Sequence, residues 1–275
     1  MKKSTYVILS FVAFAFISCT QNYDYPEAVT KIDEIVIENK TFDIVTFGRF
    51  PQSKNEDDEY NVEPVKWRVA QKKGKRAMLI CENVLNGSIP FYENFSDNRT
   101  VDGKTIYPNN YEYSEVRAYL NGLSYPDLKK TESKWNGKGF LQTAFTIEEQ
   151  ELILTTKIDN SEAQYANQSA LKKKEYICRN TRDKIFLLSK KDIENPELGF
   201  TGNESRVRNV TDYAYDHMAF RSNLSNGIWW LRTPVQLYAS RAYVVLYTGE
   251  DDETKTNRVR DPITGVVPAL WIKLN

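Results

Sequence analysis

The chain has 275 residues, in which 37 Lys and Arg residues are balanced by 37 Asp and Glu residues, and 13% of its residues are aromatic. This length allows one large domain or two small ones and a core that needs no disulfide framework. The zero net charge argues against a sequence-independent nucleic-acid binder, which needs a basic face, and the plentiful aromatic residues argue against a disordered chain. The single histidine, His217, excludes a zinc site built from several histidines.

The first eighteen residues are predicted to form an export signal. Lys2 and Lys3 precede an apolar run over residues 6–17, which is shorter than the ~20 residues of a membrane-spanning helix. The run ends in Ser18-Cys19 and resembles a bacterial lipoprotein signal, although Phe16 stands where leucine is usual. The alternative is an ordinary secretory signal in which Cys19 is incidental. We expect residues 1–18 to be removed and Cys19 to carry the lipid that anchors the protein to a membrane.

We expect the protein to lie outside the cytoplasm, attached to a bacterial membrane. Thr20 lacks the charge associated with inner-membrane retention in some bacteria, which favours the outer membrane or the cell surface. Residues 19–41, including the lipidated cysteine, are expected to form a polar tether, within which residues 32–37 are either a short strand or an extension of the tether. Residues 42–275 contain no internal repeat and are expected to form a single domain.

The first strands of this domain are expected at residues 42–50, 65–70 and 77–84, with the second and third forming a hairpin around Gly74. Ser114 is a helix N-cap that Asn121-Gly122 can close, and Thr146 with Glu149 forms the capping box of a second helix. Short strands follow at residues 185–188, 228–231, 242–247 and 266–274. The predicted class is a coil-rich α+β domain, with two early helices packed on short, mostly antiparallel strands.

Two cysteines remain in the predicted domain. Cys81 lies in an apolar run that is typical of a strand, whereas Cys178 has polar neighbours. Outside the cytoplasm these two residues can form a disulfide, and two buried thiols are the equally supported alternative. The chain has no Cys-x-x-Cys pair, which excludes a redox motif or a zinc ribbon of that spacing.

Eight segments in order resemble a bacterial extracytoplasmic family known as domain of unknown function 6273. They are FGRFPQ (47–52), EPVKWRV (63–69), SEVRAYLNG (114–122), AFT-x-E-E (144–149), DKIFLLS (183–189), TDYA (211–214), WWLRTP (229–234) and GVVPALWIKL (265–274). The resemblance covers residues 42–275 and implies a divergent C-type-lectin-like fold, related to formylglycine-generating enzymes. The chain has Thr233 and Val267 where this family pattern has serine and arginine.

The activities of such relatives do not transfer to this chain. Formylglycine generation needs a reactive cysteine pair near the C-terminus, and the two cysteines of the domain lie elsewhere. Calcium-dependent sugar binding uses Glu-Pro-Asn or Gln-Pro-Asp with Trp-Asn-Asp, and these triplets do not occur. We therefore expect no metal and no cofactor.

The candidate ligand-binding residues are Trp230, Arg232, Tyr238 and Tyr243. An indole beside a guanidinium suits a sugar face or a carboxylate, and tyrosine offers contact area and a hydroxyl at low entropic cost. The alternative is a structural role, because Trp229 and Trp230 point to opposite sides of a strand and at least one belongs in the core. The two tyrosines are equally compatible with half-buried strand positions.

No catalytic residues are predicted. His217 follows Asp216 and lies near Ser222, but adjacent Asp and His side chains rarely orient each other as a triad requires. The expected function is therefore a non-catalytic binding or adhesion module for a glycan or protein ligand, with no nucleic-acid partner. The alternatives are an extracellular enzyme acting on carbohydrate or sulfated substrates and a structural envelope protein.

Overall fold

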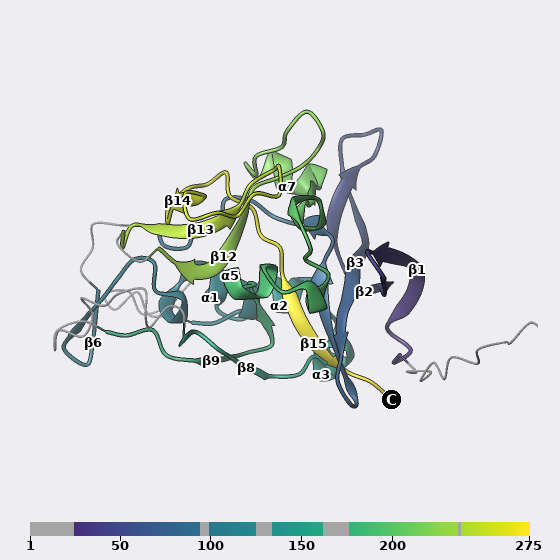
Figure 1. The fold of residues 1–275 in the computed structure, drawn as a ribbon, viewed down its shortest axis with the longest axis horizontal. Helices are drawn as coiled ribbons and strands as arrows, with labels where there is room; N and C mark the ends of the chain where they lie inside the picture. Colours follow the sequence, from purple (N-terminus) through teal and green to yellow (C-terminus); the bar gives the residue numbers. More distant parts are fainter. Residues whose placement is uncertain (1–24, 94–98, 125–133, 162–175, 236–237) are drawn as a thin grey trace, which may run out of the picture.

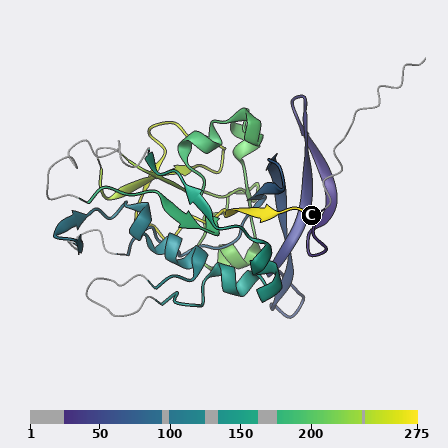
Figure 2. The ribbon, with the colours of Figure 1, turned by 90° about the horizontal axis from the view of Figure 1, so that it is seen from below.

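In the computed structural model, which describes residues 25–93, 99–124, 134–161, 176–235 and 238–275, a six-stranded antiparallel sheet forms one side of the protein (Figures 1 and 2). The predicted signal peptide at residues 1–18 and the predicted lipid site at Cys19 lie outside the described residues. Within the described part, no helix is long and apolar enough to cross a membrane.

The main sheet joins the two ends of the described chain. Its strands, in spatial order, are β1 (Thr30–Ile37), β2 (Lys40–Lys54), β3 (Tyr60–Lys72), β4 (Arg76–Cys81), β15 (Ala269–Lys273) and β10 (Ile185–Phe186). The predicted hairpin around Gly74 is confirmed as β3 and β4, and the C-terminal strand β15 lies between β4 and β10. Every pair of neighbours is antiparallel.

The first strand corrects the expected domain boundary. Residues 32–37 are part of β1, which pairs with β2 through partners such as Ile35 and Phe42, and Val29 before it is buried. The backbone groups of this segment are therefore satisfied by a neighbouring strand instead of by water. The folded part begins before residue 42, and the tether predicted at residues 19–41 does not extend through β1.

A second, smaller sheet lies beside the main one. It contains β12 (Trp229–Pro234), β13 (Arg241–Val245) and β14 (Thr256–Arg258) (Figure 1). Its strand β12 is hydrogen-bonded to the segments that adjoin β15 and β10, through Trp230 N–H to the Gly265 oxygen and Arg232 N–H to the Leu188 oxygen. Three two-stranded pairs complete the strands: β5 (Asn83–Val84) with β11 (Asn209–Val210), β6 (Arg99–Val101) with β7 (Lys104–Ile106), and β8 (Thr156–Ile158) with β9 (Thr181–Asp183). Trp67, Trp229 and Trp230 are the largest fully buried side chains.

The helices are short, and local capping signals mark their ends. Both predicted helices are confirmed: α1 begins after Ser114 and ends at the left-handed Gly122, and α3 begins with the Thr146–Glu149 capping box. The described helices are α1 (Glu115–Asn121), α2 (Phe140–Ala144), α3 (Ile147–Leu152), α5 (Lys190–Ile193), α6 (Asn203–Arg206) and α7 (Asp212–Asp216), with 3-10 turns η1 (Tyr111–Tyr113) and η3 (Pro196–Leu198).

The helices pack on the main sheet, where α2 and α7 contact β2 and α1 contacts β10. The architecture is mixed and rich in strands, with few helices and several small antiparallel sheets, which confirms the α+β class.

Candidate functional site

Two of the four residues predicted to bind a ligand are part of the interior. Trp230 is 0% exposed and its Nε1 donates to the backbone oxygen of Ile89 at 3.1 Å. Arg232 is 7% exposed, with Nη1 2.7 Å from the Leu187 oxygen and 2.6 Å from a carboxylate oxygen of Asp192. The prediction that these two side chains form a recognition surface is wrong, because both lie in β12, where each is buried and already holds protein partners.

The two predicted tyrosines lie on or near β13 but face different surroundings. Tyr238 is 61% exposed in the connection between β12 and β13. Tyr243 is half-buried against the core, and the ammonium of Lys190 lies 5.3 Å from its ring centroid. Of the four residues predicted to bind a ligand, only Tyr238 offers most of its side chain to solvent.

The two cysteines of the domain are free thiols. Cys81 ends β4 and Cys178 precedes β9, and both are buried. Burial raises the pKa of each thiol to about 12, so both remain protonated at neutral pH. Of the two alternatives left open by the sequence, the structure has the buried thiols and not the disulfide.

His217 is not part of a Ser-His-Asp triad. Its Nδ1 lies 2.7 Å from the backbone oxygen of Tyr213. Asp216 instead pairs with the Lys54 ammonium at 2.7 Å, and the Ser222 hydroxyl accepts backbone N–H groups within its own turn. Asp216 and Ser222 therefore make other contacts than those of a triad with His217.

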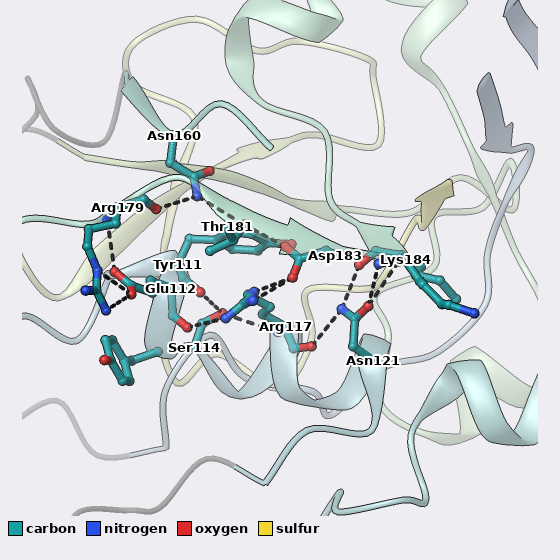
Figure 3. Close-up of polar contacts among 12 residues, drawn as sticks. Tyr111, Glu112, Ser114, Arg117, Asn121, Asn160, Arg179, Thr181, Asp183 and Lys184 are labelled. Carbon is teal, nitrogen blue, oxygen red and sulfur yellow. Dashed lines mark hydrogen bonds and ion pairs between the residues drawn. The ribbon is translucent and has the colours of Figure 1, made fainter. Parts of the chain in front are cut away.

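A buried polar network lies around α1 and β9 (Figure 3). One oxygen of Asp183 accepts from Nε and Nη2 of Arg117 at 2.7 and 2.6 Å, and its other oxygen accepts from the Thr181 hydroxyl at 2.7 Å. Glu112 accepts from the guanidinium of Arg179 at 2.9 and 2.6 Å. Both carboxylates are therefore neutralised by protein groups, which leaves this network a structural role.

The network fixes the orientation of α1. The Asn121 side-chain oxygen accepts from the backbone N–H groups of Lys184 and Ile185, and its NH₂ group donates to the Ile185 oxygen at 2.7 Å (Figure 3). Arg117 and Asn121 are four residues apart and share one face of the helix. Glu115 and Tyr119 share another face, which is therefore presented at a fixed angle.

A pocket of about 500 Å³ opens at that face, and this volume is within the range of small-molecule sites. Its walls come from β2, β3, residues 86–89, α1, residues 135–143 and the region of α7. The lining includes Asn86, Tyr119, Trp135, Lys138, Tyr213 and His217. We take this pocket as the candidate functional site.

Aromatic side chains dominate the pocket walls. The rings of Tyr119 and Trp135 meet edge to face with centroids 4.9 Å apart, and the Tyr213 and His217 rings stack at 3.9 Å. A Cβ atom at Gly87 would lie 2.3 Å from the His217 backbone oxygen. Because only glycine permits this approach, the loop of residues 86–89 and the end of α7 form one close-packed wall.

Two polar groups of the pocket, the buried Tyr119 hydroxyl and the half-buried His217 ring, retain hydrogen-bonding capacity. The Tyr119 hydroxyl accepts from Asn86 Nδ2 at 2.8 Å, and its own proton has no acceptor among the described residues. Burial raises the pKa of Tyr119, so its hydroxyl stays a donor. At His217 the carbonyl partner requires Nδ1 to donate, which leaves Nε2 of the neutral ring as an acceptor without a partner in the described chain.

Comparison with known proteins identifies the family. Residues 75–274 match the family model described as Domain of unknown function (DUF6273). The chain belongs to this family. The match begins after β3, so the segments FGRFPQ and EPVKWRV, which contributed to the resemblance, lie before it. No curated protein and no solved structure matches the chain.

The DUF6273 match contains most of the pocket, including Tyr119, Trp135, Tyr213 and His217, whereas Phe50 of β2 comes from the preceding segment. Of these four residues, only His217 is a candidate from the sequence, and there the question was catalysis and not a pocket. No group of three or more His, Cys, Asp or Glu residues that could hold a metal occurs in the described part of the chain.

Two glutamates lie beside the pocket: Glu115, on the same face of α1 as Tyr119, and Glu93, which comes earlier in the chain. They share one counter-ion, since the Lys134 ammonium lies 2.5 Å from Glu93 and 3.7 Å from Glu115. Burial, together with the charge of Glu93, raises the pKa of Glu115 to about 7. Glu115 therefore carries its proton in mildly acidic solution, where an ordinary glutamate is ionised.

This raised pKa predicts that the DUF6273 domain loses stability as the pH rises. The unfolded glutamate releases its proton near pH 4.5 and the folded one near pH 7, so the folded state holds more protons between these values. The free energy of unfolding should fall by about 1–3 kcal/mol across this window because of Glu115. Glu115→Gln should remove this loss in urea unfolding at pH 5 and pH 8.

The matched control is Glu151→Gln, which replaces an exposed glutamate of α3 and should leave the pH dependence unchanged. An equal pH dependence in the protein with Glu115→Gln and the unaltered protein would contradict the assignment to Glu115.

Proposed function

We propose that this protein is a non-catalytic recognition module that binds a sugar residue of a glycan in the pocket between α1 and α7. The observation that carries the proposal is the combination of aromatic walls with an unpaired donor at Tyr119 and an unpaired acceptor at His217 among the described residues. A pyranose ring presents C–H groups on its faces and hydroxyl groups at its edge. An aromatic wall with a few hydrogen-bonding groups complements both parts.

The carboxylates near the pocket favour binding over glycoside hydrolysis. Hydrolysis uses two carboxyl groups that flank the scissile bond. The described lining of the pocket contains no Asp or Glu, and Glu93 and Glu115 beside it share the Lys134 ammonium.

The proposal includes the location and the fold that the sequence predicts for this module. The apolar run before Cys19 supports a lipid anchor on the outside of a bacterial membrane, at the outer membrane or cell surface. The eight ordered segments support a divergent C-type-lectin-like domain, and the mixed, strand-rich architecture is compatible with that class. A rigid scaffold that carries long connections is a common basis for recognition.

A glycan array probed with the purified protein, with calcium and with a chelator, tests the proposal. We expect a saturable signal that survives chelation and that Trp135→Ala weakens about tenfold or more, because an aromatic anchor in a pocket dominates such binding. Trp135→Phe should retain most of the affinity, and Leu224→Ala, at an exposed position outside the pocket lining, should have no effect.

Tyr238→Ala separates this proposal from the surface suggested by the sequence. A loss of binding in Tyr238→Ala together with unchanged binding in Trp135→Ala would place recognition at the connection between β12 and β13 and overturn the pocket. The absence of any glycan signal would also overturn the proposal and would favour a structural envelope role.

A further inference from the structure

The described lining of the pocket carries a positive charge and no negative charge. Lys138 is the only Lys or Arg among the described residues of its lining, and no Asp or Glu contributes to this lining. The Lys138 side chain is exposed at the rim and forms no ion pair with a described residue. Its backbone N–H donates to the Trp135 oxygen at 3.0 Å, so the lysine and the indole belong to one turn.

Nearby acidic groups do not compensate this lysine. Asp216, which precedes the lining residue His217, is held by the Lys54 ammonium at 2.7 Å and the Tyr60 hydroxyl at 2.8 Å. Glu93 and Glu115 share the Lys134 ammonium, at 2.5 and 3.7 Å. The pocket therefore presents one positive charge without a described counter-charge next to an aromatic wall.

We infer that the pocket selects a sugar residue that carries one negative charge, either a carboxylate or a sulfate ester, with the ring against Trp135 and the charged group at Lys138. This inference rests on the proposed function. A lysine acts as a compact point charge and suits a single anionic group, whereas an arginine would favour bidentate binding. A neutral sugar would leave the lysine unused, and a cationic sugar would be repelled by it.

NMR titration of the protein with glucose, glucuronate and glucose 6-sulfate tests this selection. Both anionic sugars should bind about two- to fivefold more tightly than glucose, which is the range for an exposed ion pair. This preference should decrease when the salt concentration rises from 0.02 to 0.5 M, about the range over which screening becomes strong. A difference between glucuronate and glucose 6-sulfate would identify which of the two anionic groups is preferred.

Lys138→Gln should abolish the preference, so that the affinities for the three sugars lie within about twofold of one another. Lys73→Gln, at an exposed lysine in the turn between β3 and β4, is the matched control and should retain the preference. Equal affinity for the three sugars, or an equal loss for all three in Lys138→Gln, would overturn the charge selection alone. Failure of every sugar to bind would overturn the proposed function as well.

Discussion

Replacement of Arg117 by methionine should destabilise the protein by about 3–5 kcal/mol, because it leaves the Asp183 carboxylate buried without its cation. The Asp183 side chain is 0% exposed and keeps only the Thr181 hydroxyl as a described partner after the change. The replacement also removes the donor to the Glu112 backbone oxygen at 2.7 Å. Urea unfolding at pH 7 measures the loss.

A second replacement tests the physical cause. Arg117→Met combined with Asp183→Leu removes both charges and should recover much of the lost stability, because a buried ion pair contributes little over apolar residues of similar size. Lys40→Met at the exposed pair between Lys40 and Glu197 should cost less than about 1 kcal/mol. Similar losses for the single and the double replacement would show that the cost is not due to an unpaired charge.

Trp230→Ala should destabilise the protein by about 3–5 kcal/mol, the usual cost of truncating a large core aromatic residue. The change removes a fully buried indole that packs edge to face on Phe91, with centroids 5.9 Å apart. It also leaves the Ile89 backbone oxygen without its indole donor. Thermal and urea unfolding should both show the loss.

Tyr238→Ala gives the contrast, since removal of an exposed tyrosine should change stability by no more than about 0.5 kcal/mol. A normally stable Trp230→Ala protein that no longer binds its ligand would instead restore Trp230 as a recognition residue.

The elements that could be predicted from the sequence are those with local signals. Ser114 and Gly122 mark the ends of α1 through hydrogen bonding of the first turn and a left-handed final residue. The two apolar runs on either side of Gly74 are also a local signal, and they predict the hairpin of β3 and β4. The sequence does not decide between a strand and a tether at β1. Most of its residues are exposed, so they do not show the alternation of a half-buried strand.

The candidate site could not be predicted because no local pattern specifies it. Asn86, Tyr119, Trp135 and Tyr213 are far apart in the sequence and meet only after the chain folds. The same limit explains the error at Trp230 and Arg232, since alternation assigns opposite sides to neighbouring residues but does not show that both sides of β12 are covered. Exposure depends on the second sheet and the elements packed around it.

The position of β15 has a consequence for how the chain reaches its folded state. β15 pairs with β4 and β10, and its partner Leu79 in β4 is about 190 residues earlier in the sequence than Leu270. Such long-range pairing is slow to form. Until β15 inserts, β4 and β10 have no strand between them, and their unpaired edges can associate with other chains. Folding of the main sheet is therefore complete only when the C-terminal strand is in place.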